Sequence, residues 1–271
     1  LLNLTKNKAY KVRAIYRNTQ SLEKIRQLFV KHSDSGAAQF DTIEWIQTDL
    51  SNIPALEKAF EGVTFVFHCA GLISFQPQDF DKLIEVNVQG TANIVNLSID
   101  FGVKKLCYVS SVATLSTLPH TPIDEENDWN NEDNNTDYAI SKHGAEMEVW
   151  RGSQEGLPVV IVNPSVVLGG DFTDRGSGLL YKKVADGLRY YPAGATGFVG
   201  VGDVVRAMVQ LQFSEVDGER FVLNAENLTY KAVLERIANQ LGVKTPTKRV
   251  SHQMLRFLAR LDRVLSFLHL K

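Results

Sequence analysis

The stretch Val63-Thr64-Phe65-Val66-Phe67-His68-Cys69-Ala70-Gly71 decides the fold class of this chain. Residues 63–67 are apolar at nearly every position, as expected for a parallel strand that is buried on both faces of a sheet. Such a strand belongs to an α/β sheet that is covered by helices on both faces. The sequence on either side should therefore alternate between helices and strands.

Helical and strand-like segments do alternate around this stretch. Helices are predicted at residues 21–29, 80–101 and 138–155, where apolar side chains recur on one helical face. Pro54 follows Ser51-Asn52, which suits the first turn of one more helix. The other predicted strands are residues 12–16, 43–46, 106–109 and 159–162. This alternation predicts an α/β fold of the doubly wound, parallel-sheet Rossmann type with a small C-terminal substrate lobe.

Two domains are expected. Residues 1–168 are predicted to form a dinucleotide-binding Rossmann domain, and residues 169–271 mainly a substrate-binding lobe with some elements that return to the Rossmann sheet. The segment Leu1-Leu2-Asn3-Leu4 resembles the end of a helix and leads directly into the strand at Val12. We therefore expect the native polypeptide to extend upstream by about fifteen to twenty residues that hold a strand and a Gly-x-x-Gly-x-x-Gly turn.

The composition excludes several classes of protein. The chain has 271 residues, of which 44% are hydrophobic and 22% charged, as is usual for a globular protein with a sizeable core. Its formal net charge of −2 leaves no basic footprint, so nucleic acid is not expected as a partner. No apolar run approaches the roughly twenty residues that cross a bilayer.

The cysteines and histidines predict neither a disulfide framework nor a metal site. Cys69 and Cys107 each adjoin an apolar run, which favours reduced thiols in a cytoplasmic protein. The six histidines show no spacing with cysteines or carboxylates that is typical of metal ligands. We therefore predict no metal.

Tyr138-Ala139-Ile140-Ser141-Lys142 places a phenol and an ammonium on the same face of a predicted helix. A nearby cation stabilises the phenolate and should lower the pKa of Tyr138 toward the range that is useful for proton transfer. Because a four-residue spacing is common on helices, a solvated surface pair is the alternative interpretation.

Ser110-Ser111 follows the predicted strand 106–109, at the edge of the sheet where ligands bind in open α/β folds. A serine hydroxyl at this place can contact a substrate. The alternative is a turn or helix-capping role, which is also common for serines after strands.

The order of these motifs resembles that of a known family. Tyr108-Val109-Ser110-Ser111 and the Tyr138–Lys142 pair occur together with Val86-Asn87-Val88-Gln89-Gly90-Thr91 and with Asn163-Pro164-Ser165-Val166-Val167-Leu168-Gly169. From Val12 to about Val243, the chain resembles the extended short-chain dehydrogenases/reductases of the NAD-dependent epimerase/dehydratase superfamily. Within them it is most similar to the dihydroflavonol reductase and 3β-hydroxysteroid dehydrogenase branch.

The resemblance implies roles for individual residues. Tyr138 would be the general acid/base, Lys142 its pKa-lowering partner and the ribose anchor, and Ser111 the donor that polarises the substrate carbonyl. Asn87 would support the helix beneath the site. The resemblance also implies a set of cofactor-binding residues: Asp49 and Leu50 beside the adenine, Cys69, Ala70 and Gly71 beside the ribose and phosphates, Ser110, Tyr138 and Lys142 at the active site, and Pro164, Ser165 and Val166 at the nicotinamide end. Asp49 could equally cap a helix.

The position of Arg17 indicates whether NADP(H) or NAD(H) is the preferred cofactor. Arg17 follows the strand 12–16, whose end faces the adenosine ribose in a dinucleotide fold. An arginine there can receive a 2′-phosphate through charge-assisted hydrogen bonds, which favours NADP(H) and leaves NAD(H) possible. The alternative is that Arg17 lies in solvent without such a role, since Arg13 shows that arginines occur elsewhere in this strand.

The predicted function is an NAD(P)-dependent oxidoreductase that transfers hydride between the nicotinamide and a carbonyl or secondary alcohol of a small, largely apolar substrate. A nucleotide-sugar epimerase on the same fold is the nearest alternative, but residues 190–199 are nearly uncharged where those relatives carry a basic stretch. Dehydration is set aside because Val112-Ala113 stands where that subgroup has Asp-Glu. A non-catalytic dinucleotide-binding sensor or scaffold remains as the alternative from another class.

The C-terminal segment 254–271 predicts a strongly amphipathic helix, with Arg256, Arg260 and Arg263 opposite its apolar side. We expect this helix to pack on the substrate lobe or on the second subunit of a homodimer. Contact with a membrane surface is the alternative.

Overall fold

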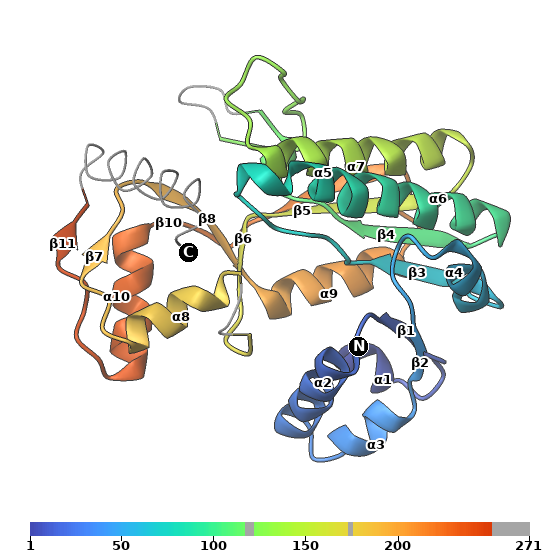
Figure 1. Cartoon of the computed structure of the whole chain (residues 1–271), viewed down its shortest axis with the longest axis horizontal. Coiled ribbons are helices and arrows are strands. Elements are labelled where there is room, and N and C mark those ends of the chain that lie inside the picture. The colour runs from blue at the N-terminus through green and yellow to red at the C-terminus, as the bar shows by residue number, and fades with distance from the viewer. Residues whose placement is uncertain (117–121, 173–175, 251–271) are drawn as a thin grey trace. The chain divides into compact units, whose positions relative to one another are not determined.

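The computed structural model describes residues 1–116, 122–172 and 176–250 (Figure 1). They form two compact units. The first consists of Leu1–Pro164 and Gly202–Leu223, and the second of Ser165–Val201 and the described residues from Asn224 onward. The functions predicted for the two parts of the chain remain predictions.

The first unit is built on a parallel sheet. Its four strands lie in the order β3 (Phe65–His68), β4 (Lys105–Val109), β5 (Val159–Pro164) and β9 (Glu219–Leu223), and every neighbouring pair is parallel. Figure 1 shows helices on both faces of this sheet. One face carries α5 (Phe80–Leu83), α6 (Gly90–Asp100) and α7 (Asp137–Gln154), and the other carries α9 (Val201–Gln212). The predicted parallel-sheet Rossmann-like fold is confirmed.

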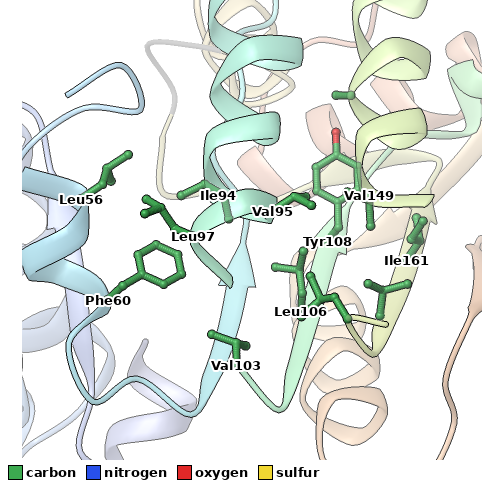
Figure 2. Packing of buried hydrophobic residues seen from close by; sticks show 13 residues of the cluster. Leu56, Phe60, Ile94, Val95, Leu97, Val103, Leu106, Tyr108, Val149 and Ile161 are labelled. Carbon is green, nitrogen blue, oxygen red and sulfur yellow. The ribbon is translucent and has the colours of Figure 1, made fainter. Parts of the chain in front are cut away.

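The core of the first unit lies between the sheet and the helices α4 (Ile53–Phe60), α6 and α7 (Figure 2). Leu106 and Tyr108 of β4, Ile161 of β5 and Val149 of α7 are completely buried there. Burying one such side chain stabilises the fold by roughly 1.5–3 kcal/mol. Because α7 packs on β4 and β5, the polar residues on the same side of this helix are buried as well.

The strand β3 differs from its prediction. Residues 63–67 were expected to be buried on both faces, but the strand spans Phe65–His68, and Phe65 is 39% exposed. The reason is the position of β3 at the edge of the four-stranded sheet. The strands β1 (Arg13–Tyr16) and β2 (Glu44–Gln47) pair in parallel with each other in a separate two-stranded sheet.

Helices pack against this smaller sheet, and one of them contains the predicted helix 21–29. They are α1 (Leu2–Thr5), α2 (Thr19–His32) and α3 (Gly36–Asp41). Helix α4 begins at Ile53 with Pro54 in its first turn, as predicted, because Asn52 accepts a hydrogen bond from the backbone N–H of Ala55. The predicted helix 80–101 is also present, although its middle, Ile84–Gln89, is π-helical (η2).

The second unit has its own sheet and core. Its sheet has the order β10 (Glu226–Thr229), β8 (Ala195–Gly200), β6 (Val166–Leu168), and a short pair joins β7 (Tyr190–Tyr191) to β11 (Lys248–Arg249). The helices α8 (Gly178–Ala185) and α10 (Tyr230–Leu241) contribute buried side chains, among them Val184, Val233 and Ile237, to one hydrophobic cluster with Phe198.

None of the helices in the described part of the chain is long and apolar enough to cross a membrane. The predicted amphipathic helix 254–271 lies outside the described residues.

Candidate active site

Helix α7 carries Tyr138 and Lys142. The helix begins at Asp137 because the hydroxyl of Thr136 accepts a hydrogen bond of 3.2 Å from the backbone N–H of Ala139. Tyr138 therefore lies in the first turn and Lys142 one turn later, on the same face. Neither is a solvated surface residue, since Tyr138 is half-buried and Lys142 is buried.

Tyr138 forms a hydrogen bond with Ser111. Ser111 begins the 3-10 turn η3 (Val112–Thr114) directly after β4, and its hydroxyl also accepts a 3.1 Å hydrogen bond from the N–H of Ala113. The predicted serine and tyrosine are thus brought together, although 27 positions separate them in the sequence, from 111 to 138. The same serine serves as the cap of the turn.

The pKa of Tyr138 does not shift in the predicted direction. Burial raises the pKa of this phenol, and the hydrogen bond with Ser111 opposes the rise. The expected lowering by Lys142 is wrong for this structure, because the ammonium points elsewhere. The Lys142 Nζ donates to the Tyr108 hydroxyl at 2.6 Å and to the backbone carbonyl of Val109 at 2.8 Å.

Lys142 is an ammonium group inside the protein, with 5% of its surface exposed. Its Nζ also lies 4.4 Å from the centre of the Tyr108 ring, a favourable cation–π distance. Burial lowers the pKa of Lys142 to about 8, while Glu146 and then Cys69 act in the opposite direction. At neutral pH the amine therefore carries its proton.

A buried polar chain continues inward from Lys142. The Tyr108 hydroxyl forms a hydrogen bond with Thr91, and the Thr91 hydroxyl lies 2.9 Å from the Nε2 of His68. Burial, and next the charge of Lys142, lower the pKa of His68 to about 3. His68 is therefore neutral at physiological pH. Sequence analysis quoted Thr91 and His68 within longer stretches but assigned a role to neither residue.

Asn87 ties the loop after β3 to helix α7. Its Oδ1 accepts from the N–H of Leu72 at 2.6 Å, and its Nδ2 lies 3.0 Å from the carbonyl oxygen of Leu72 and 2.9 Å from the Ser141 hydroxyl. Asn87 lies in the π-helical turn η2, and such turns are frequent at functional sites. The side chain joins the predicted ribose segment at Gly71 to the helix that carries Tyr138 and Lys142.

Ser110 is directed into the protein. Its hydroxyl donates to the Oε2 of Glu146 at 2.5 Å, and both residues are buried. Sequence analysis missed Glu146, although a signal was present: the residue continues the four-residue spacing from Tyr138 to Lys142 by one more turn. Helical periodicity therefore pointed to a third polar residue on this face.

Cys69, Ala70 and Gly71 follow β3 and are exposed. An added Cβ at Gly71 would lie 3.4 Å from the Asn87 Oδ1 and 4.0 Å from the Lys142 Nζ, so a side chain there would crowd the approach to the ammonium. Of the other predicted cofactor residues, Pro164 ends β5, whereas Ser165 and Val166 belong to the second unit.

The predicted adenosine end is more exposed. Arg17 follows β1 and is exposed, and Asp49 follows β2. The Asp49 Oδ1 accepts hydrogen bonds from Ser51 and from the N–H of Asn52, which, with Arg17 as a smaller influence, lower the pKa of this carboxyl. Asp49 thus shapes the turn that leads into α4.

A hollow of about 410 Å³ opens beside the half-buried Leu50. It is lined by Leu50, Ser51, Glu85, Gln89, Ala92 and Asn93. The Asn93 side chain donates to the carbonyl of Leu50 at 2.8 Å, which fixes this wall to helix α6.

Two apolar side chains are exposed in the loop after β3, and one of them, Phe75, contacts Tyr138. Phe75 is 70% exposed and Ile73 is 60% exposed, both in the loop that Asn87 anchors. The Phe75 ring lies edge-on to the Tyr138 ring with 5.9 Å between their centres. Among the described residues, no group of three or more His, Cys, Asp and Glu side chains could hold a metal ion.

Residues 1–224 match the model of the family described as "NAD dependent epimerase/dehydratase family". The chain is 27% identical over 241 residues to "Sterol demethylase protein B" of Methylococcus capsulatus, covering 88% of this chain and 74% of that protein. It is 26% identical over 248 residues to "Putative dihydroflavonol 4-reductase" of a Synechocystis species, covering 89% and 68%. The solved structure "Crystal structure of gox2253" matches with a TM-score of 0.76 at 26% identity, covering 95% of this chain and 83% of that one. The chain therefore belongs to the NAD-dependent epimerase/dehydratase family and is an enzyme of the extended short-chain dehydrogenase/reductase type.

Proposed function

We propose that this enzyme reduces a carbonyl group, or oxidises the corresponding secondary alcohol, on a small and largely apolar substrate. The observation that carries the proposal is the hydrogen-bonded pair of Tyr138 and Ser111, with the buried ammonium of Lys142 one helical turn away. A nicotinamide bound at this site supplies or accepts the hydride. The protein has to supply the proton and hold the oxygen atom.

Tyr138 is suited to donate that proton. Burial raises the pKa of its phenol, so the hydroxyl is protonated at neutral pH and can pass its proton to a carbonyl oxygen that gains electrons. Ser111 binds the same phenol, and its hydroxyl can donate to the substrate oxygen. In the oxidative direction the step starts from the phenolate of Tyr138, which has already lost its own proton and takes up the proton of the alcohol.

The residues fit a nicotinamide dinucleotide at the site. Lys142 has three N–H donors, and the two oxygen acceptors of Tyr108 and Val109 leave one for a ribose hydroxyl. Gly71 leaves space in front of that ammonium. Lys142, Gly71 and their neighbours Cys69 and Ala70 would hold the ribose.

For the cofactor we propose NADP(H), with Arg17 as the residue that binds the 2′-phosphate. The exposed guanidinium follows β1, and its influence on the pKa of Asp49 indicates that the two side chains are near each other after adjacent strands. Asp49 and Leu50 would then lie beside the adenine. Arg13 differs, because its guanidinium already binds Glu44 and two backbone carbonyls.

For the substrate we propose an apolar group next to the reacting carbon. Phe75, whose ring contacts Tyr138, and the exposed Ile73 of the same loop offer uncharged contact surface. The family description also names epimerases, so a nucleotide sugar is the second candidate. A sugar diphosphate would require cations around this loop, where residues 71–76 carry none.

A turnover assay tests the proposal. The enzyme is incubated with NADPH or NADH and a panel of aromatic and aliphatic ketones and aldehydes, with NADP⁺ or NAD⁺ and secondary alcohols, and with UDP- and dTDP-sugars. Reduced nicotinamides absorb at about 340 nm, so we expect the absorbance at this wavelength to change when carbonyl compounds or alcohols are added. Interconversion of sugar nucleotides without net cofactor change would instead establish the epimerase.

A further inference from the structure

The carboxylate of Glu146 is a buried charge that the proposed reaction does not use directly. The side chain is 1% exposed, and its Oε2 lies 2.5 Å from the Ser110 Oγ, 2.9 Å from the Thr114 Oγ1 and 3.0 Å from the Asn163 Nδ2. These donors come from the end of β4, from η3 and from β5. A carboxylate held in this way joins three segments to α7, because a buried charge is tolerated only when it is fully hydrogen-bonded.

Two of these donors also hold the backbone of Ser111. The Thr114 Oγ1 lies 2.9 Å from the carbonyl oxygen of Ser111, and the Asn163 Nδ2 lies 3.2 Å from the same oxygen. Thr114 has a single hydroxyl hydrogen, which the Ser111 carbonyl and the Glu146 carboxylate share. The carboxylate is therefore part of the framework that sets the position of the Ser111 hydroxyl.

Glu146 also acts on Lys142, which lies one turn earlier on the same face of α7. Burial lowers the pKa of Lys142, and Glu146 is the largest of the influences that raise it. The other charged or titratable groups that interact with this pair come from several elements: Arg220 from β9 and His143 from α7 on Glu146, and Tyr108 from β4, His68 from β3 and the adjoining Cys69 on Lys142.

We propose that Glu146 is a positioning residue of the active site: its carboxylate fixes the turn that carries Ser111 and supports the ammonium of Lys142. Glu146 acts through these two residues and contacts no reactant. The inference rests on the proposed oxidoreductase function. It assigns two contributions to Glu146: its hydrogen bonds hold the turn that carries Ser111, and its negative charge stabilises the ammonium of Lys142.

Two variants and a matched control test the proposal. Glu146→Gln keeps the size and one oxygen acceptor but removes the charge. Thr114→Val removes the shared hydroxyl and leaves the charge in place. Glu148→Gln is the control, because Glu148 lies on the same helix but binds Arg151 at 2.9 Å, away from Ser111 and Lys142.

We expect Glu146→Gln to lower kcat about ten- to a hundred-fold with little change in KM, as a small misplacement of catalytic groups does. The alkaline limb of the pH–rate profile should move to lower pH, because loss of the anion lowers the pKa of Lys142. Thr114→Val should lower kcat without moving that limb, and Glu148→Gln should change neither.

A readout without turnover separates the inference from the proposed function. NMR titration of ¹³C-labelled lysine side chains, with Lys142 assigned through Lys142→Arg, should show a lower Lys142 pKa in Glu146→Gln than in the wild type. An unchanged Lys142 pKa together with unchanged kcat would overturn the role of Glu146, while Tyr138→Phe still tests the reaction. If the wild type turns over no carbonyl compound, the proposed function fails and the titration alone decides on Glu146. If Glu146→Gln does not fold, wild-type kcat in Thr114→Val overturns the inference.

Discussion

The two ends of the predicted cofactor site differ in how their side chains are held. Around Lys142, the phenol of Tyr108 and the carboxylate of Glu146 are buried, and their hydrogen bonds come from strands and helices that are distant in the sequence. Around Arg17 and Asp49 the side chains are exposed, and Asp49 accepts hydrogen bonds from Ser51 and Asn52, two and three positions later in the sequence.

This difference predicts where substitutions should matter most. A buried polar group that loses its partner retains the cost of its lost hydration, about 1–3 kcal/mol, whereas an exposed group rebinds water. At the buried end, a substitution that removes a single polar atom should therefore lower activity or stability. At the exposed end, a substitution should change only the affinity for the bound ligand. Three predictions test this contrast in order of expected size.

The largest effect is expected at the phenol. Tyr138→Phe removes the proton donor but keeps the ring, so kcat should fall about a hundred- to ten-thousand-fold, while the cofactor Kd stays nearly unchanged. Steady-state kinetics and fluorescence titration with the cofactor measure the two effects. Tyr10→Phe is the matched control, since Tyr10 contacts Phe213 through its ring. Wild-type kcat in Tyr138→Phe would show that the proposed mechanism is wrong.

A second prediction concerns the neutral histidine beneath the site. The pKa of His68 is about 3 in the folded protein, against an ordinary value of 6.5. Below pH 6.5 the unfolded chain binds a proton that the folded chain does not, so stability that is present above pH 6.5 is lost as the pH falls toward 3.

Between pH 7 and pH 5 the free energy of unfolding should therefore fall by about 2 kcal/mol more in the wild type than in His68→Gln. Urea denaturation at the two pH values measures this difference. The glutamine keeps a polar group within reach of Thr91 but does not titrate. Parallel losses of stability in the two proteins would mean that the histidine is hydrated, and the contrast between the two ends would weaken.

The smallest effect is expected at the exposed end. Arg17→Ala should reduce the preference for NADP(H) over NAD(H) about ten-fold, because it removes one exposed, charge-assisted hydrogen-bonding contact to the 2′-phosphate. The substitution should leave kcat and stability almost unchanged. Isothermal titration with both cofactors gives the ratio of affinities. Arg13→Ala is the control and should lower stability without changing that ratio, because Arg13 binds Glu44 and the carbonyls of Ala59 and Glu61. An unchanged ratio in Arg17→Ala would exclude Arg17 as the discriminator.

Local patterns in the sequence were sufficient for much of the framework. Strands and helices alternate as predicted, Pro54 lies in the first turn of α4, and Tyr138 and Lys142 share one face of α7. These features depend on periodicity, capping and backbone restriction, which act over a few residues. The edge position of β3 could not be predicted in this way, because the apolar run 63–67 does not reveal how many strands pair with it.

By itself, the sequence determined which polar side chains stand at strand ends and on one helical face. Only the tertiary structure decided what each of them contacts. Lys142 binds Tyr108, 34 residues away, instead of lowering the pKa of Tyr138, and Ser110 binds Glu146, 36 residues away. Such contacts form only when β4, β5 and α7 pack together, and burial then shifts the pKa of each group by removing its water. For this reason the sequence could indicate candidate residues for the site, but not the carboxylate that holds them or the protonation that they adopt.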